Sequence, residues 1–317
     1  MGVPSLDLLV IGEINPDLLV TGPDVEPEFG QVEKLVSRAK LAVGSSSVIT
    51  ACAAARLGLR TGFAGVVGED PLGRFMLDAM RERGIEVRGC VVDPDQETGV
   101  TVVLSDEARG RAILTAPGAM ARFRAEDVDP DLVGAARHVH CAGYFLQPAL
   151  HAGLPDLFAT ARRAGATTSL DPNWDPAETW DVRDVIAQAD LFVPNEAELL
   201  AITGAGTLED AVADLARPDL TVAVKRGAAG GEWHRGPTHL RLPAPAIDAV
   251  DTTGAGDAFT AGLLHAFLNG EPPERQLALA VATGSLATRA LGGVDAQPDL
   301  IEAHRLAAVL DLEGSRT

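Results

Sequence analysis

The stretch VDTTGAGDAFTAGLL, residues 250–264, places an acidic residue at the start of an apolar helical pattern. Gly254, Ala255 and Gly256 come directly before Asp257, so a backbone with almost no side chains leads into the predicted helix. The first N–H groups of a helix have no partner within it, and small residues let an anion approach them closely. Asp257 then fits two descriptions. It is either a carboxylate that caps its own helix or a base beside an anion-binding backbone, which suits phosphoryl transfer to a hydroxyl.

Two common nucleotide-binding patterns do not fit this stretch. Counted from Gly254 and Gly256, the third glycine of a dinucleotide-binding fingerprint would fall at position 259, which is Phe259. The dipeptide Gly-Lys, which a Walker P-loop requires, occurs nowhere in the chain. A dehydrogenase and a P-loop enzyme are therefore disfavoured.

The net charge of the chain disfavours two classes of binding partner, nucleic acid and anionic membranes. The 317 residues include 26 Lys and Arg against 45 Asp and Glu, a formal net charge of −19. This charge repels nucleic acid and anionic lipid, and the sequence contains no apolar run of about 18 residues that could span a membrane. The first residues read as a strand and carry no basic segment typical of a signal peptide. We expect a cytoplasmic protein that binds neither nucleic acid nor membrane.

Strand-like and helix-like patterns alternate along most of the chain. Helical patterns cover 46–58 and 71–84, the second with Pro71 in its first turn. Apolar strand patterns occur at 6–12, 61–68, 136–143, 166–173, 189–195 and 220–227. Repeated alternation of this kind predicts an α/β fold, with a mostly parallel central sheet and helices on both of its faces.

Two segments, 13–43 and 95–119, interrupt the alternation because neither has a helical pattern. The second contains two short alternating strands, Thr98–Leu104 and Arg111–Thr115. Both segments leave the α/β core and return to it, so they could pair into one small sheet that covers an edge or a site. We expect residues 1–317 to form a single domain with a lid made by these two segments.

The motifs also resemble a known family. VDTTGAGDAFTAGLL resembles the C-terminal signature of the ribokinase-like sugar kinases, the phosphofructokinase-B family, and the segment 43–76 resembles that family's N-terminal signature. PNEAEL and VKRGAAGG follow in the family's order, so the resemblance covers nearly the whole chain. It implies transfer of the γ-phosphoryl group of ATP to a hydroxymethyl group of a sugar. By the same resemblance, Asp257 would be the general base, and the N–H groups of Gly254, Ala255 and Gly256 would stabilise the phosphoryl charge.

The resemblance also implies a nucleotide side of the site. Asn195 and Glu198 match an Asn-x-x-Glu motif that organises Mg²⁺ and its waters near the ATP phosphates. Lys225, Gly227 and Gly230 match the strand and turn that border the nucleotide.

Two further positions belong to the same expectation. Gly284 lies in an Ala- and Gly-rich helix, 277–291, that leaves space either for adenine or only for close helix packing. Asp251 matches the acid that holds a monovalent cation, K⁺, in some members of the family; its alternative is a turn acid.

Four residues occupy the positions that bind the acceptor in the family: Asp17, Gly44, Ser45 and Asn173. A carboxylate such as Asp17 accepts two or more strong hydrogen bonds, which suits the recognition of sugar hydroxyls. The chain departs from the family at Ser45, where a second glycine is usual, and at Ile49, where an Asn is expected. Asp175 stands where relatives carry an arginine that suits acidic or phosphorylated sugars, so a neutral sugar is favoured.

The sequence therefore leaves three hypotheses about function. The favoured hypothesis is an ATP-dependent sugar kinase that uses Mg²⁺, with K⁺ as a further candidate. The second is a nucleoside kinase of the same fold, and the third is a non-catalytic regulator that binds a sugar or nucleotide. By resemblance alone, we also expect a homodimer that forms through the lid.

Overall fold

The computed structural model describes residues 5–106 and 110–310, and within them two sheets are formed. The larger sheet has the strand order β13-β12-β11-β10-β9-β8-β1-β4-β5. Its strands are β1 (Leu6–Ile11), β4 (Thr61–Gly68), β5 (Glu86–Asp93), β8 (Ala136–Cys141), β9 (Thr167–Leu170), β10 (Leu191–Phe192), β11 (Thr221–Lys225), β12 (Gly231–Arg235) and β13 (Thr238–Leu242). Only the pairs β11–β12 and β12–β13 are antiparallel, so the predicted mostly parallel sheet is confirmed.

The larger sheet buries both of its faces, as the side chains of β1 show. Successive residues of a strand point to opposite faces. Leu8 and Val10 therefore join one apolar cluster, and Leu9 and Ile11 join another. All four side chains are fully buried, which explains why β1 is continuously apolar and does not alternate with polar residues.

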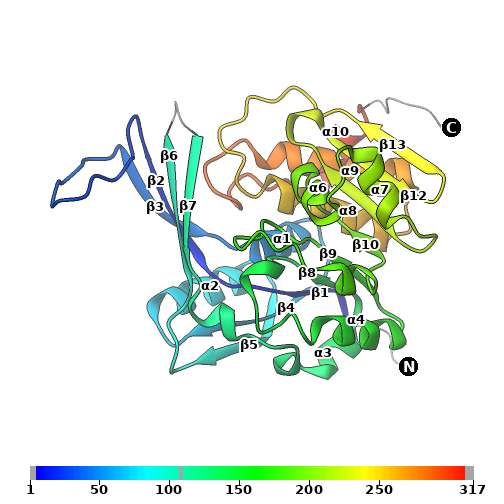
Figure 1. Ribbon diagram of the computed structural model, residues 1–317, viewed down its shortest axis with the longest axis horizontal. Helices are drawn as coiled ribbons and strands as arrows, with labels where there is room; N and C mark the ends of the chain where they lie inside the picture. The colour runs from blue at the N-terminus through cyan, green and yellow to red at the C-terminus, as the bar shows by residue number, and fades with distance from the viewer. Residues whose placement is uncertain (1–4, 107–109, 311–317) are drawn as a thin grey trace.

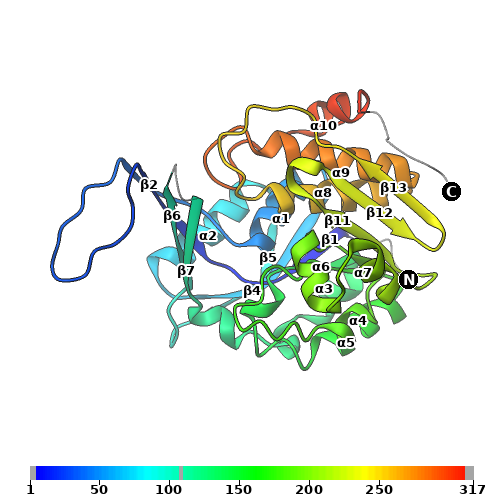
Figure 2. The same cartoon turned by 45° about the horizontal axis from the view of Figure 1, so that its top comes forward.

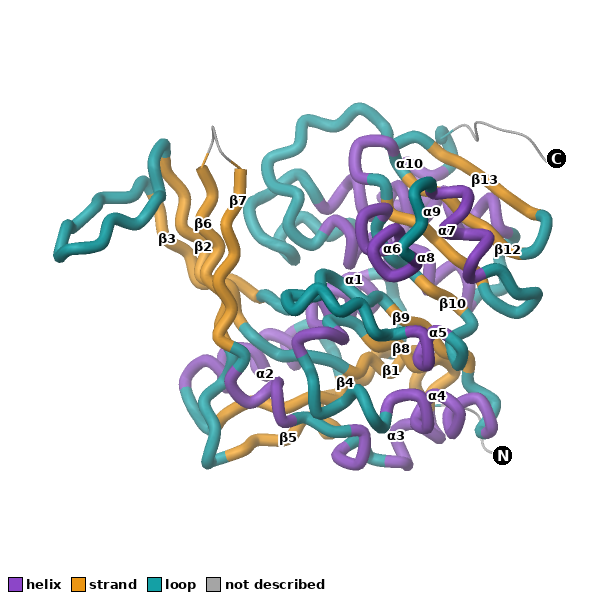
Figure 3. The backbone as a smooth tube through the Cα atoms, viewed as in Figure 1, coloured by secondary structure: helices purple, strands orange, loops and turns teal. Residues whose placement is uncertain are grey.

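Helices cover these two faces (Figure 3). One face carries α1 (Ser46–Arg56), α2 (Pro71–Glu82), α8 (Ala255–Leu268) and α9 (Pro273–Ala287), and α10 (Leu300–Ala307) packs on α9. The other face carries α3 (Pro130–Ala135), α4 (Leu154–Arg163), α5 (Arg183–Ile186), α6 (Glu196–Thr203) and α7 (Leu208–Leu215). Short 3₁₀ turns occur at Gly118–Arg122, Ala125–Asp127, Tyr144–Leu146 and Gly227–Ala229. None of the helices in the described residues is long and apolar enough to cross a membrane.

The second sheet is small and stands beside the main body (Figure 1). Its strands pair in the order β3-β2-β6-β7 and are β2 (Pro16–Gly22), β3 (Arg38–Val43), β6 (Val100–Asp106) and β7 (Gly110–Ala116). The segments 13–43 and 95–119 supply these strands, so the small sheet expected from the sequence is present. The loop between β2 and β3 reaches away from the larger sheet in both views (Figure 2).

The strand order places a crevice at β1. From β1 the chain adds β4 and β5 on one side, and it later adds β8 to β11 on the other side. In an open α/β sheet, ligands bind beyond the carboxyl ends of the strands at the point where the strand order reverses. A ligand-binding site is therefore expected among the residues that follow β1 and β8.

Candidate active site

A cavity of about 1390 Å³ lies at the carboxyl edge of the larger sheet. Five parallel strands contribute a residue to its wall at or soon after their carboxyl ends: Glu13, Phe145, Asn173, Asn195 and Lys225. The first turn of α8 and the inner face of the small sheet complete the wall. The cavity thus occupies the place that the strand order indicates.

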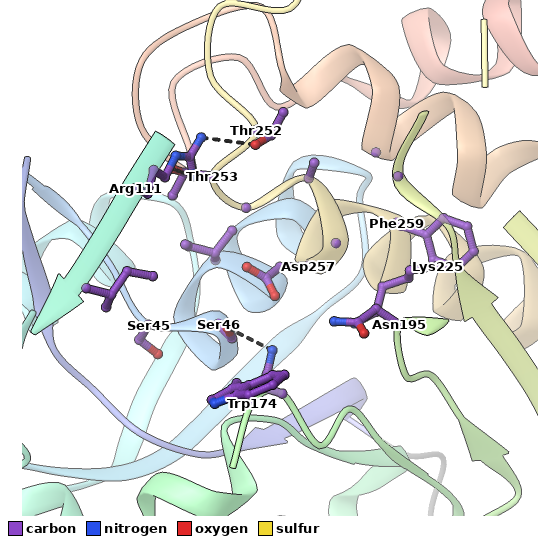
Figure 4. Close-up of a pocket in the computed structure, with 18 of the residues that line it drawn as sticks. Ser45, Ser46, Arg111, Trp174, Asn195, Lys225, Thr252, Thr253, Asp257 and Phe259 are labelled. Atoms are coloured by element: carbon purple, nitrogen blue, oxygen red, sulfur yellow. Dashed lines mark hydrogen bonds between the residues drawn. The ribbon is translucent and has the colours of Figure 1, made fainter. Parts of the chain in front are cut away.

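Most of the site residues expected from the sequence meet in this cavity (Figure 4). Those that line it are Asp17, Ser45, Asn173, Asn195, Glu198, Lys225, Gly227, Gly230, Gly254, Ala255, Gly256, Asp257 and Gly284. Gly44 and Asp251 lie behind the wall, each in contact with a residue that lines the cavity.

The first turn of α8 presents bare backbone N–H groups. Gly254 is the residue before the helix and has φ +74°, a left-handed conformation that glycine adopts without strain. A Cβ at this position would lie 2.8 Å from the Cα of Gly293, so space as well as conformation requires glycine here. The Ala255 N–H, expected to face the phosphoryl group, instead donates to the Thr252 carbonyl at 3.3 Å. The N–H groups of Gly256 and Asp257 have no hydrogen-bond partner among the described residues. These two donors are available to an anion in the cavity.

The Asp257 side chain points into the cavity instead of capping the helix (Figure 4). No side chain caps the start of α8, so the capping description of Asp257 has no support in the geometry. The residue is 7% exposed. Burial raises the pKa of Asp257 well above its usual value, and the nearby Asp171 raises it further, while Lys225 and Ser46 oppose the shift. A buried carboxyl with a raised pKa is suited to accept a proton.

Lys225 lies beneath the N–H groups and is committed to a buried ion pair. Its Nζ donates to both oxygens of Asp171, at 2.7 and 2.6 Å, and the Thr260 hydroxyl donates to Asp171 at 3.0 Å. A Cβ on Gly256 would lie 3.3 Å from the Lys225 side chain. This side chain therefore packs directly against the backbone of Gly254–Asp257, the segment called the cradle from here on. Burial acts to lower the pKa of Lys225, but Asp171 and Glu198 raise it overall. The lysine therefore supports the cradle from below as a permanent positive charge.

Asn195 and Glu198 form a capping box at the start of α6. The Asn195 side chain accepts from the Glu198 N–H, and Glu198 Oε2 accepts from the Asn195 N–H, both at 2.8 Å. Glu198 is buried, and burial raises its pKa. Glu198 Oε1 has no hydrogen-bond partner among the described residues, although the side chain lines the cavity. This spare oxygen fits a role beside a hydrated Mg²⁺, which prefers oxygen ligands and keeps several waters.

Two of the three glycines expected to border the nucleotide, Gly230 and Gly284, are required by close backbone packing. A Cβ on Gly230 would lie 1.9 Å from the carbonyl oxygen of Leu242, and φ is +87°. A Cβ on Gly284 would lie 2.9 Å from the carbonyl oxygen of Ala255, where α9 crosses α8. Gly284 thus permits close helix packing and also lines the cavity, and its expected contact with adenine stays a prediction.

The end of the cavity where the acceptor is expected is lined by residues spaced two apart after β1. Glu13, Asn15 and Asp17 all line the cavity. Burial raises the pKa of Asp17 to about 7, and Glu13 and Asp251 add to the shift. A Cβ on Gly44 would lie only 2.1 Å from Asp17 Oδ1, so Gly44 acts by leaving room for this carboxylate.

Ser45 and Asn173, which line the cavity, also hold the segments around it in place. Both adopt positive φ, 68° and 56°, which is unusual for residues other than glycine. Ser45 Oγ donates to the Glu13 carbonyl at 2.6 Å and accepts from the Val48 N–H, so it caps α1. Asn173 accepts from the Gly143 N–H at 2.7 Å and donates to the Ser46 hydroxyl at 3.1 Å (Figure 4).

The departures at Ile49 and Asp175 also have physical explanations. Ile49 lines the cavity, and its side chain occupies the space that a Cβ on Gly254 or Gly293 would need. Asp175 accepts hydrogen bonds from three backbone N–H groups and the Thr179 hydroxyl within its own loop, and it does not line the cavity. Its carboxylate organises the loop.

Several cavity residues were not among the sequence-based candidates: Glu13, Asn15, Ser46, Thr101, Arg111 and Trp174. The i, i+2 spacing that relates Glu13 and Asn15 to Asp17 was a usable signal, because such residues share one face of an extended chain. Arg111 had no local signal, because its partners lie about 140 residues further along the chain.

Arg111 connects the small sheet to the segment that leads into the cradle. Its guanidinium pairs with Asp251 and donates to the hydroxyls of Thr252 and Thr253, at 3.0 and 2.7 Å. Asp251 also accepts from the Thr253 N–H and the Gly292 N–H, both at 2.9 Å. The acid expected to hold a monovalent cation is thus already engaged by protein donors.

Comparison with known proteins agrees with this architecture. The model of the pfkB family carbohydrate kinase matches residues 5–300. The chain belongs to this family. It is therefore an ATP-dependent carbohydrate kinase.

Individual relatives and solved structures are similar over most of the chain. A fructokinase of Klebsiella pneumoniae is 35% identical over 274 residues, covering 80% of this chain and 88% of the relative. An ATP-dependent ribose-1-phosphate kinase of Halopiger xanaduensis is 32% identical over 249 residues, covering 77% and 79%. The structure of Arabidopsis thaliana ribokinase complexed with ribose and ATP matches with a TM-score of 0.83 and 25% identity, covering 95% of this chain and 98% of that one.

The Gly44–Asp17 contact yields a first test. In Gly44→Ala the new methyl group displaces the Asp17 carboxylate, and we expect KM for the sugar to rise about 10- to 100-fold, because small displacements at a binding site cost this much. Steady-state kinetics with sugar as the varied substrate measures the effect.

Gly134→Ala is the matched control, because a Cβ on this α3 residue meets no atom within 4 Å. This variant should keep the wild-type KM. An unchanged sugar KM in Gly44→Ala would contradict the placement of Asp17 in the acceptor site.

Proposed function

We propose that this kinase transfers the γ-phosphoryl group of ATP to a hydroxymethyl group of a neutral sugar, with Asp257 as the general base. One observation carries the proposal. A buried carboxyl with a raised pKa and two unpaired backbone N–H groups, those of Gly256 and Asp257, adjoin one cavity at the start of α8.

The proposed division of labour follows from this arrangement. The sugar hydroxyl lies beside Asp257, which accepts its proton as the oxygen attacks the γ-phosphorus. The bare N–H groups at the start of α8 then donate to the phosphoryl oxygens as their charge develops, and the helix dipole acts in the same direction. The small sheet excludes water from the cavity as a lid, which limits hydrolysis of ATP.

Mg²⁺ fits the nucleotide side of this site. The free Oε1 of Glu198 and the nearby Asn195 would hold the ion through water, and the bound ion would neutralise phosphate charge. The chain's own contribution is to fix both side chains through the capping box at the start of α6.

The charges of the cavity favour a neutral acceptor. Glu13, Asp17 and Asp257 line the cavity, and these acids disfavour an anionic sugar. Arg111 and Lys225 are the cations among the described residues of the wall, and carboxylates already engage both of them.

The sequence left two alternatives. A nucleoside kinase of the same fold differs in the acceptor, whereas a non-catalytic regulator conflicts with membership of the carbohydrate kinase family. A regulator would be expected to lack the base or the anion cradle, and this chain keeps Asp257 and Gly254–Gly256. The phosphorylated product, a sugar phosphate or a nucleoside phosphate, distinguishes the sugar kinase from the nucleoside kinase.

The cytoplasmic location expected from the sequence stays a prediction.

A homodimer through the small sheet is the second part of the proposal. Strand register places Leu18, Leu41, Val102 and Leu114 on the face of the small sheet opposite Asp17 and Thr101, and these two line the cavity. Leu114 is 61% exposed and Leu41 is 42% exposed. An apolar outer face of this kind is typical of a surface that a second subunit covers.

Asp257→Asn tests the proposed base. We expect kcat to fall about 10²- to 10⁴-fold, the usual contribution of general base catalysis, with the affinity for ATP retained. An ADP-release assay over pentoses, hexoses, polyols and nucleosides measures the rate and identifies the acceptor, and calorimetry measures nucleotide binding.

Asp156→Asn makes the same chemical change in the first turn of α4, outside the cavity, and should leave kcat unchanged. Turnover of nucleosides alone would favour the nucleoside kinase. No turnover in the wild type, with ligand binding unaffected by Asp257→Asn, would favour the regulator.

Leu114→Lys tests the proposed dimer, since a charge in the centre of an apolar interface costs far more than one on its rim. Light scattering coupled to gel filtration should give the dimer mass for the wild type and the monomer mass for the variant. Val92→Lys, at an exposed position of β5, is the control and should remain dimeric. A monomeric wild type at micromolar concentration would overturn this part of the proposal.

A further inference from the structure

The guanidinium of Arg111 occupies a position where the family resemblance leads one to expect a metal ion. Arg111 comes from β7 of the small sheet, and it reaches Asp251, Thr252 and Thr253 on the segment that runs directly into Gly254 (Figure 4). The two sides of this contact lie about 140 residues apart in the chain.

The carboxylate of Asp251 has no free position for a monovalent cation in this arrangement. Oδ1 accepts from the Thr253 N–H at 2.9 Å, from the Thr253 hydroxyl at 2.8 Å and from Arg111. Oδ2 accepts from the Gly292 N–H at 2.9 Å. The side chain is 6% exposed, so little water reaches it. Four protein donors thus engage Asp251, and the guanidinium already neutralises its charge, so a second cation such as K⁺ does not fit this set.

A second basic residue of the small sheet reinforces the same contact. Lys40 of β3 donates to the Leu291 carbonyl at 3.2 Å and pairs with Asp295. Leu291 precedes Gly292, whose N–H donates to Asp251. Arg111 and Lys40 therefore connect the small sheet to the two segments that surround Asp251, and the position of Arg111 depends on how the small sheet lies against the body.

We propose that Arg111 is a built-in cation that takes the place of K⁺ at Asp251, so that the kinase works without a monovalent cation. This inference rests on the proposed function. Arg111 acts as a positioning residue: it neutralises Asp251 and fixes Thr252 and Thr253, and these residues hold the backbone that leads to the N–H groups of the cradle. Because the guanidinium is carried by the small sheet, the charge is in place only while that sheet lies over the cavity.

The test compares the wild type with Arg111→Gln in potassium chloride and in choline chloride at equal ionic strength. Choline is too large to enter a site at Asp251. Two readouts are needed: the melting temperature of the protein without substrates, and kcat with the sugar found by the screen. Arg111→Lys is added as the conservative variant.

We expect the wild type to melt at the same temperature and turn over at the same rate in both salts. In choline chloride, Arg111→Gln should lose up to about 100-fold in kcat, the cost that a misplacement of about 1 Å in an active site can carry. Potassium should raise both its melting temperature and its kcat, because Asp251 then has a free position. Arg111→Lys should keep most of the wild-type rate in choline chloride.

Two control variants separate this role from a general loosening of the structure. Lys40→Gln weakens the contact of the small sheet but leaves Asp251 paired with Arg111, and Arg81→Gln removes an exposed arginine of α2. Neither should acquire a response to potassium.

A wild type that is stabilised or activated by potassium relative to choline would overturn the inference. Arg111→Gln with an unchanged kcat and no response to potassium in either readout would overturn it as well. If no acceptor is phosphorylated at all, the proposed function fails, and the melting temperatures alone then decide whether Arg111 replaces the cation.

Discussion

The burial of Asp257 beside the bare N–H groups of α8 is the constraint on which the rest of the site depends. An ionised carboxylate and a transferring phosphoryl group repel each other, so a base in this place requires compensating donors and cations. The fold supplies the donors at the start of α8, where the N–H groups of Gly256 and Asp257 have no partner among the described residues. Two cations, Lys225 and Arg111, supply the compensating positive charge. Each is held by an ion pair with a residue of an element far away in the chain.

Lys225 and Arg111 provide this compensation on opposite sides of the cradle. Lys225 lies beneath Gly256 and is held by Asp171, which follows β9. Arg111 reaches the segment before Gly254 from the small sheet. The first pair is buried within the body of the enzyme, and the second depends on a separate sheet. Under the proposed function, in which the small sheet is a lid, this difference would connect the electrostatics of the cradle to the closure of the cavity.

Sequence patterns predicted the fold and much of the site, because these features are local. The apolar run of β1, the helix after Asp257 and the Asn195–Glu198 capping box all arise from residues within one element. The pairings Lys225–Asp171 and Arg111–Asp251 join residues 54 and 140 positions apart, and no periodicity relates them. Ser45 was expected at the acceptor, but its hydroxyl caps α1, and only the backbone geometry with its positive φ reveals this.

The dependence of kcat/KM on pH tests the role of Asp257 most directly. Since burial and Asp171 raise its pKa, the base is ionised only above the normal range of an aspartate, and the rate should fall as the pH drops through that raised pKa. Asp171→Asn removes a negative charge that raises this pKa, so the acid limb of the profile should move to lower pH. A rate that does not change with pH below neutrality, or an acid limb that Asp171→Asn leaves in place, would contradict the assignment of Asp257 as the base.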